Sequence, residues 1–257
     1  MKKFTLYFLL LLLIVGIGAL VFGFWNARNI RNFSSRAQGL VKKYSFELQI
    51  GEIEKNIRGS SAKKASEMNQ EARNFVVQLE GLIEQSQSAA RETKALSAPK
   101  DARPTKDLIL AYYEKSGKQA TELKGFVEFM RDNFEVADVF SQINQNTTLD
   151  EMKALINQAK EKVGVIETST LPESLQPSAS ELKQSMENFL LKLEETATLL
   201  SLDTDELNKA YSSFSEKQSN FSAEGKKYLG SLEDLAPMKG QINSELLKLS
   251  GIYFRIE

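Results

Sequence analysis

The stretch ASEMNQEARNFVVQLEGLIEQSQSAARETKAL, residues 65–96, decides the fold. Its apolar and small residues recur at alternating intervals of three and four: Ala65, Met68, Ala72, Phe75, Leu79, Leu82, Ser86, Ala89, Thr93 and Leu96. In an α-helix this spacing places them on one face, in the seam that a heptad repeat buries against a neighbouring helix. Residues 65–96 are therefore predicted to form a long amphipathic helix.

The same spacing returns four times downstream, at residues 109–137, 152–166, 179–200 and 207–235. Five helices with short connections predict an all-α, antiparallel up-and-down bundle of four or five helices. Several seam positions are small or polar: Ser86, Ala89, Thr93, Ser116, Ala120, Gln218 and Gly225. Thin core layers of this kind also fit a second arrangement, an extended coiled coil that shares its seams with another chain.

Two kinds of residue mark the predicted helix ends. Thr148 with Glu151, and Ser178 with Glu181, match the capping box at a helix start. All five prolines fall at boundaries of the predicted helices, where a missing N–H stops a helix. Two pairs lie between helices, Pro99 with Pro104 and Pro172 with Pro177, and Pro237 closes the last helix. The two proline pairs share one spacing and lie 73 residues apart, which indicates either a duplicated helical hairpin or a chance alignment of heptads.

Residues 4–25 contain no charged side chain and include the run Leu9 to Leu13. As a helix this stretch is roughly 33 Å long, enough to cross a hydrocarbon core of about 30 Å. We predict a single transmembrane helix, an uncleaved anchor at residues 1–25. The membrane-interface residues are expected to be Lys2, Lys3, Tyr7, Trp25, Arg28 and Arg31.

A cleaved signal peptide is the alternative for this segment, with Ala19 or Ala27 before the cut. Both sites are poor, because one leaves an apolar run on the new terminus and the other has bulky Trp25 where a small residue is wanted. Ala19 and Gly23 form a small-xxx-small pair, which predicts a contact between two anchor helices.

Charge divides the rest of the chain into a basic juxtamembrane segment, residues 26–64, and a bundle domain, residues 65–257. The first carries a net charge of +6 and the second a net charge of −9. Membrane lipid is one expected partner, and the basic segment is expected to contact anionic lipid or an acidic cell-wall polymer, unless it is only a solvated linker. The bundle is expected to bind a protein partner or a second copy of itself through its helices.

Most catalytic chemistry is excluded because the chain contains no Cys and no His. Thiolate nucleophiles, the usual metal ligands and the commonest general base are thereby missing. The adjacent pair Glu194 and Glu195 points in directions about 100° apart on a helix and is expected to be solvated. We therefore predict no enzyme, no cofactor, no metal and no nucleic-acid binding.

The function predicted from these features is binding. The chain is expected to be a single-pass, membrane-anchored protein whose extracytoplasmic bundle serves as a scaffold, spacer or accessory subunit of an envelope assembly. Two arguments oppose each other on the orientation of the anchor. A short basic N-terminal tail such as Lys2-Lys3 usually stays in the cytoplasm, which places the bundle outside, whereas Arg28, Arg31 and Arg36 after the helix favour a cytoplasmic bundle. The alternative function is ligand sensing with a separate signalling partner, since the layout resembles the four-helix sensory domains of chemoreceptors.

Overall fold

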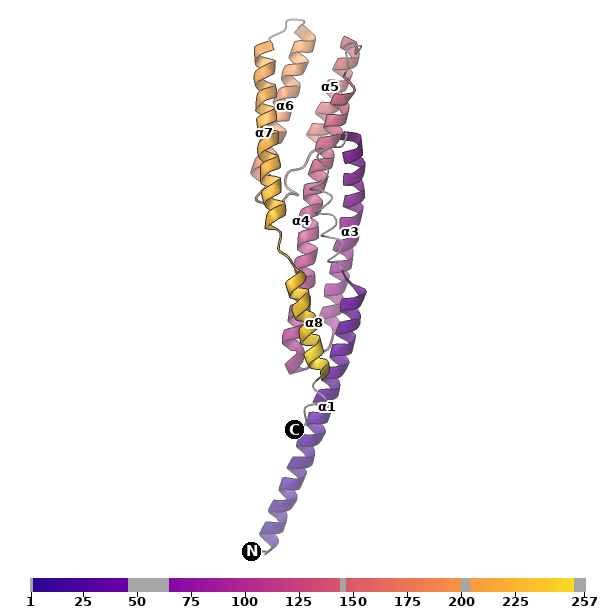
Figure 1. Cartoon of the computed structure of the whole chain (residues 1–257), viewed down its shortest axis with the longest axis vertical. Helices are drawn as coiled ribbons and strands as arrows, with labels where there is room; N and C mark the ends of the chain where they lie inside the picture. The colour runs from indigo at the N-terminus through magenta and orange to yellow at the C-terminus, as the bar shows by residue number, and fades with distance from the viewer. Residues whose placement is uncertain (1, 46–64, 144–146, 200–203, 252–257) are drawn as a thin grey trace. The chain divides into compact units, whose positions relative to one another are not determined.

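The structure is a computed structural model that describes residues 2–45, 65–143, 147–199 and 204–251, and for residues 2–22 only the course of the backbone. Within these ranges the chain is helical and contains no strand, which confirms the all-α fold (Figure 1). The elements are α1 (Lys2–Lys43), α3 (Ala65–Ala95), the 3-10 helix η1 (Lys100–Ala102), α4 (Arg103–Ser141), α5 (Leu149–Gly164), α6 (Gln176–Leu199), α7 (Thr204–Ser231) and α8 (Ala236–Gly251). The five predicted helices are confirmed as α3 to α7.

The chain folds into two compact units, and α3 and α4 contribute to both. Unit 1 consists of Met1–Glu47, Glu84–Gly117 and Asp234–Glu257, and unit 2 consists of Leu48–Ile83 and Lys118–Glu233. Unit 1 carries 16 Lys and Arg against 9 Asp and Glu, whereas unit 2 carries 17 against 25. The charge segregation seen along the sequence therefore follows the units, with a net charge of +7 on unit 1 and −8 on unit 2.

In unit 1 the second half of α1 belongs to the packed core. Ile30, Phe33, Ala37 and Leu40 are all buried, at the same three-and-four spacing as the predicted seams. Helix α8 lies beside this part of α1, and the Ser34 hydroxyl donates to the Leu246 carbonyl at 2.9 Å (Figure 1). Residues 26–43 of the predicted juxtamembrane segment are thus helical and partly buried. The sequence reading had offered lipid contact or a solvated linker for them.

The small seam residues of unit 1 allow α3 and α4 to approach closely. A Cβ added at Gly117 would lie 3.3 Å from the Ser86 Cβ, so neither position leaves room for a larger side chain. The buried hydroxyls of Thr93 and Ser116 donate to the carbonyls of Ala89 and Tyr112 one turn earlier. The thin layers at these positions are filled by neighbouring helices of the same chain.

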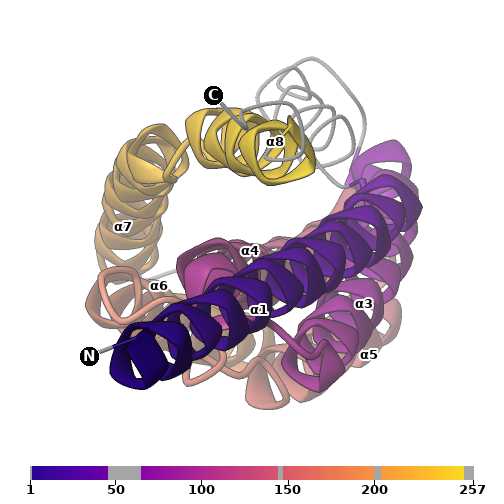
Figure 2. The ribbon, with the colours of Figure 1, turned by 90° about the horizontal axis from the view of Figure 1, so that it is seen from below.

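In unit 2, α6 packs against both α5 and α7 (Figure 2). A wide aromatic face of α4 supplies much of the core: Phe126 and Phe129 are buried and contact the ring of Phe221 on α7. Gly225 of α7 lies against Phe126, with 3.1 Å between its added Cβ and the ring. Toward its end, α4 buries Val136 and Val139, so its buried face is rotated from the predicted seam.

The capping box at Thr148 is confirmed, whereas the one predicted at Ser178 is wrong. Thr148 and Glu151 exchange the two expected hydrogen bonds at the start of α5. Helix α6 has already begun at Gln176, and the Ser178 hydroxyl donates back to the Leu175 carbonyl at 3.1 Å.

The prolines begin helices rather than stop them. Pro104, Pro177 and Pro237 are each the second residue of a helix, where the missing N–H would have had no partner. Pro237 was predicted to close the last helix, and it instead opens α8, which the sequence reading missed.

The two proline pairs introduce the same local structure. The Ala102 N–H donates to the Pro99 carbonyl at 2.9 Å, and the Leu175 N–H donates to the Pro172 carbonyl at 2.8 Å. Helices α4 and α6 follow these turns directly, at positions 73 residues apart. The repeated turn agrees with a duplicated hairpin, which stays a prediction.

Among the residues whose side chains are described, no helix is both long and apolar enough to cross a membrane. Most of the predicted transmembrane stretch, residues 4–22, lies outside that range. What the structure adds is the course of the backbone: α1 runs without interruption from Lys2 to Lys43, through the predicted boundary at residues 25 and 26.

We expect Gly125→Ala to lower the free energy of unfolding by roughly 2–4 kcal/mol, measured by urea denaturation. A Cβ at Gly125 would lie 2.1 Å from the Thr170 carbonyl oxygen, so the loop that crosses α4 must move. Gly81→Ala on α3 is the matched control, because nothing lies within 4 Å of its added Cβ. There the gain in helix propensity should stabilise the protein by up to about 1 kcal/mol. Equal effects of the two substitutions would contradict the close packing of residue 170 on α4.

Candidate functional site

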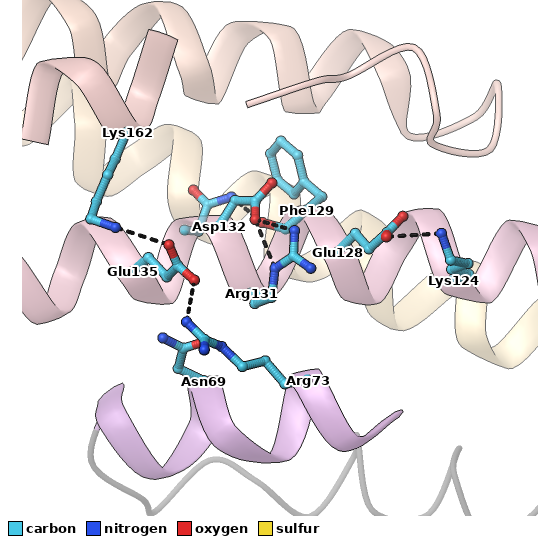
Figure 3. Close-up of polar contacts among 10 residues, drawn as sticks. Asn69, Arg73, Lys124, Glu128, Phe129, Arg131, Asp132, Glu135 and Lys162 are labelled. Carbon is cyan, nitrogen blue, oxygen red and sulfur yellow. Dashed lines mark hydrogen bonds and ion pairs between the residues drawn. The ribbon is translucent and has the colours of Figure 1, made fainter. Parts of the chain in front are cut away.

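The densest set of polar contacts in unit 2 is centred on Glu135 of α4 (Figure 3). One carboxylate oxygen of Glu135 accepts a hydrogen bond from Arg73 Nη2 on α3, and the other accepts one from Lys162 Nζ on α5, both at 2.9 Å. Asn69 Oδ1 accepts from Arg73 Nε at 3.3 Å and so helps to orient the guanidinium. A single carboxylate therefore joins three helices.

Two further acidic groups of α4 lie along the same face (Figure 3). Lys124 pairs with Glu128 one turn later at 2.9 Å and with Glu80 of α3 at 3.4 Å. The Asp132 carboxylate accepts two hydrogen bonds from the neighbouring Arg131, at 2.7 and 2.9 Å. The network thus contains a second bridge between α3 and α4, from Lys124 to Glu80, and two pairs confined to α4.

The carboxyl groups of this network differ in the direction of their pKa shifts. The pKa of Glu135 is held below its ordinary value of 4.5, chiefly by the hydrogen bond from Lys162, with burial opposing it and Arg73 adding to it. The pKa of Asp132 is raised above 3.8, because the cost of burying its charge outweighs the pairing with Arg131. Glu135 is therefore stabilised as a carboxylate by folding, and Asp132 is not.

Ion pairs continue the cross-linking from α5 to α7. Lys160 of α5 pairs with Glu194 of α6 at 2.6 Å. Lys192 of α6 lies 2.9 Å from Glu195 on its own helix and 3.0 Å from Glu206 on α7. Glu194 and Glu195 point apart and pair with different lysines. Both side chains are partly exposed, but they are ion-paired and not simply solvated as predicted.

Taken together, these contacts are ion pairs and hydrogen bonds that hold neighbouring helices to one another. In the part of the chain that the structure describes, no group of three acidic residues is arranged to hold a metal ion. Each pair is partly exposed, so its contribution is modest, about 0.2–1 kcal/mol for most such pairs. Their positions differ from one helix pair to the next, so they favour one register over others.

A second cluster of interhelical polar contacts lies in unit 1, at the end of α1. The Tyr44 hydroxyl donates to Glu92 Oε1 on α3 at 2.8 Å, and Lys43 Nζ pairs with the same oxygen at 2.7 Å. This sharing lowers the pKa of Glu92, through Lys43 first and Tyr44 second. The Tyr44 carbonyl accepts a hydrogen bond from the buried Tyr113 hydroxyl at 3.4 Å. The end of α1 is thus held to both α3 and α4.

Two hollows lie beside these contacts. In unit 2, an apolar cavity of about 20 Å³ between α3 and α4 is lined chiefly by Met68, Phe75, Val127 and Met130. It has room for about one water molecule and none for a larger ligand. In unit 1, an open groove of about 390 Å³ runs between α1 and α3, and the Lys43–Glu92 pair lies on its lining.

The structure places half of the predicted site residues. Phe24 and Trp25 are 67% and 60% exposed, and Arg28 and Arg31 are exposed on the same helix. Gly23 is exposed, and nothing lies within 4 Å of its added Cβ. The side chains of the remaining predicted residues, Lys2, Lys3, Tyr7 and Ala19, lie outside the described ones.

The sequence reading missed Tyr44, Glu92 and Glu135. Tyr44 continues the spacing of the buried α1 residues, and that signal could have found it. Glu92 and Glu135 had no signal, because their partners are distant along the chain. Comparison with protein-family models, with curated proteins and with solved structures finds no match for the chain.

We expect Glu135→Gln to lower the free energy of unfolding at pH 7 by about 1 kcal/mol, because both ion pairs are lost. Glu135 has a depressed pKa, so its stabilisation is present above pH 4.5 and is lost as the pH falls through its folded-state pKa. Urea denaturation between pH 7 and about pH 3 should therefore show the two proteins converging. The pKa of Asp132 is raised chiefly by burial and in smaller part by the charge of Glu135, so the substitution also changes the Asp132 contribution, by less than it changes the contribution of Glu135.

Glu187→Gln on α6 is the control for removing an acidic charge. Glu187 is exposed, and its side chain makes no hydrogen bond or ion pair with the described residues, so its substitution should change the stability at neutral pH by less than about 0.5 kcal/mol. A Glu135→Gln difference that stayed constant down to the acid end of the series would contradict the ion-pair assignment.

Proposed function

We propose that the chain is a single-pass, membrane-anchored helical-bundle protein that acts by binding, as a scaffold, spacer or accessory subunit of an envelope assembly, and not as an enzyme. The observation that carries this proposal is the continuity of α1. Its first part contains the uncharged residues 4–25, and its second part is packed into unit 1. An anchor joined to a bundle in this way has no flexible linker between them, which suits a protein that holds partners at a fixed distance.

Two exposed aromatic residues support the position of the anchor. Phe24 and Trp25 stand at the end of the uncharged stretch, and exposed Arg28 follows one turn later. An amphipathic ring followed by a cation is typical of the end of a transmembrane helix. The alternative, ligand sensing with a separate signalling partner, stays a prediction.

We expect the double substitution Leu12→Arg and Val15→Arg to release the full chain from membranes. Two arginines near the centre of the anchor cost about 5–7 kcal/mol of insertion free energy. The measurement is the fraction of protein that stays in the pellet after alkaline carbonate extraction. The control is Val77→Arg with Val165→Arg, since these valines of unit 2 are 67% and 73% exposed. Release of the unsubstituted chain, or retention of the Leu12/Val15 variant, would contradict the anchor.

Two further measurements test the remaining parts of the proposal. Fusion of alkaline phosphatase or green fluorescent protein after Glu257 in a bacterial host reports the side of the membrane. Phosphatase activity without fluorescence supports the extracytoplasmic placement, and the reverse overturns it. Chemical cross-linking in intact membranes then tests binding: recovery of the chain only as an unlinked monomer contradicts a scaffold role.

A further inference from the structure

The turn between α3 and α4 lies next to the exposed aromatic residues of α1. Asn26 Nδ2, one residue after Trp25, donates to Asp101 Oδ2 in η1 at 3.2 Å. Helix η1 contacts α1, and its residue Ala102 is fully buried. Both sides of this contact belong to unit 1. Residues 97–103 are therefore held at the level of α1 where the uncharged stretch ends.

This turn brings cations that lie far away in the sequence to the same level. Lys100 and Arg103 are exposed, as is Arg28 of α1, and none of their three side chains makes a hydrogen bond or ion pair with the described residues. Asp101 is the one acidic residue in the turn, and its carboxylate already accepts from Asn26. The local charge is therefore positive and available to an external anion.

The surface formed by Phe24, Trp25, Arg28, Lys100 and Arg103, called here the anchor-side surface, combines exposed rings with free cations. Rings of this kind favour the headgroup level of a bilayer, and Lys or Arg near an anionic leaflet is attracted to it. Without Lys2 and Lys3, which precede the proposed anchor, unit 1 carries 14 Lys and Arg against 9 Asp and Glu, so a net charge of +5 remains on the side of the bundle. Charge and apolar character together match an acidic lipid surface.

We propose that the anchor-side surface binds the headgroups of anionic phospholipids in the membrane that holds α1. The inference rests on the proposed anchor and adds to it a specific lipid class and a second contact from the α3–α4 turn. The lipid contact is thus made by folded unit 1 and includes residues about 75 positions away from the anchor.

The test uses the full chain in vesicles of phosphatidylcholine, with or without about one third phosphatidylglycerol. Because the chain has no Cys, Ser97→Cys gives one labelling site in the turn for a fluorophore. A headgroup-nitroxide lipid then reports the proximity of the label to the bilayer by quenching. Trp25, the one tryptophan of the chain, reports the anchor independently in the same sample.

We expect the label at residue 97 to be quenched more strongly, by about twofold, when phosphatidylglycerol is present. Lys100→Gln with Arg103→Gln should remove most of that increase and leave the quenching of Trp25 unchanged. Lys100→Arg with Arg103→Lys keeps the charge and should retain the increase. Lys209→Gln with Lys226→Gln, two exposed positions of unit 2, removes equal charge and should have no effect.

Each other outcome overturns the inference. Quenching that does not depend on phosphatidylglycerol, or that survives loss of both cations, excludes recognition of anionic headgroups. Absence of label quenching while Trp25 is quenched shows that the anchor inserts but the turn does not reach the lipid. Absence of both, with the chain remaining free of vesicles, contradicts the proposed anchor as well.

Discussion

The burial of one face of α1 is the constraint on which the structure of unit 1 depends. One face of α1 is buried against neighbouring helices along a continuous stripe formed by Ile30, Phe33, Ala37 and Leu40. Burial of each of the larger side chains contributes about 1–3 kcal/mol to the stability of the fold. A helix held by such a stripe cannot rotate about its axis without exposing it. The direction in which Trp25 and Arg28 face is therefore set by the packing of residues further along the same helix.

Unit 2 is organised by a different balance of forces. Its core is apolar, but some core positions carry small or polar residues. Where the side chains between two helices are small, they interdigitate little, and one helix can shift along the other by a turn. The pairs of Glu135, Lys160 and Lys192 link α4, α5, α6 and α7 in succession, so a slip of one helix by a turn breaks the pairs that this helix makes. Individually weak pairs thus act on register more than on total stability.

The helices that the sequence predicts correctly are those whose spacing is uninterrupted. The spacing did not lead to a correct prediction where charged residues or a proline in the same segment suggested another interpretation. The same three-and-four pattern occurs at residues 30, 33, 37, 40 and 44. Arg31 and Arg36 lie between these positions, and they favoured the interpretation of the segment as the basic flank of a membrane helix. Ile242, Leu246 and Leu249 carry it in α8, which was missed because Pro237 was read as a terminator. A proline is compatible with the first turn of a helix and incompatible with a helix interior. The sequence alone therefore does not tell whether a proline ends the helix before it or begins the helix after it.

The candidate sites were less predictable than the helices. Exposed Trp25 and Arg28 were found because the anchor and its flank are continuous in the chain. The contacts of Asp101 with Asn26, and of Glu135 with Arg73, join residues 75 and 62 positions apart. Their pairing follows from how the helices pack, and no local pattern indicates it.

If residues 4–25 span a bilayer as proposed, the continuity of α1 also couples the tilt of that segment to unit 1. From residue 26 to Lys43 the helix is about 27 Å long, so a change in tilt of about 10° displaces its far end by roughly 5 Å. A transmembrane helix adjusts its tilt when the bilayer becomes thinner or thicker. With residues 4–25 in a membrane, a change in the tilt of α1 would displace Tyr44. Glu92 of α3, which is bonded to Tyr44 in the same unit, would follow that displacement.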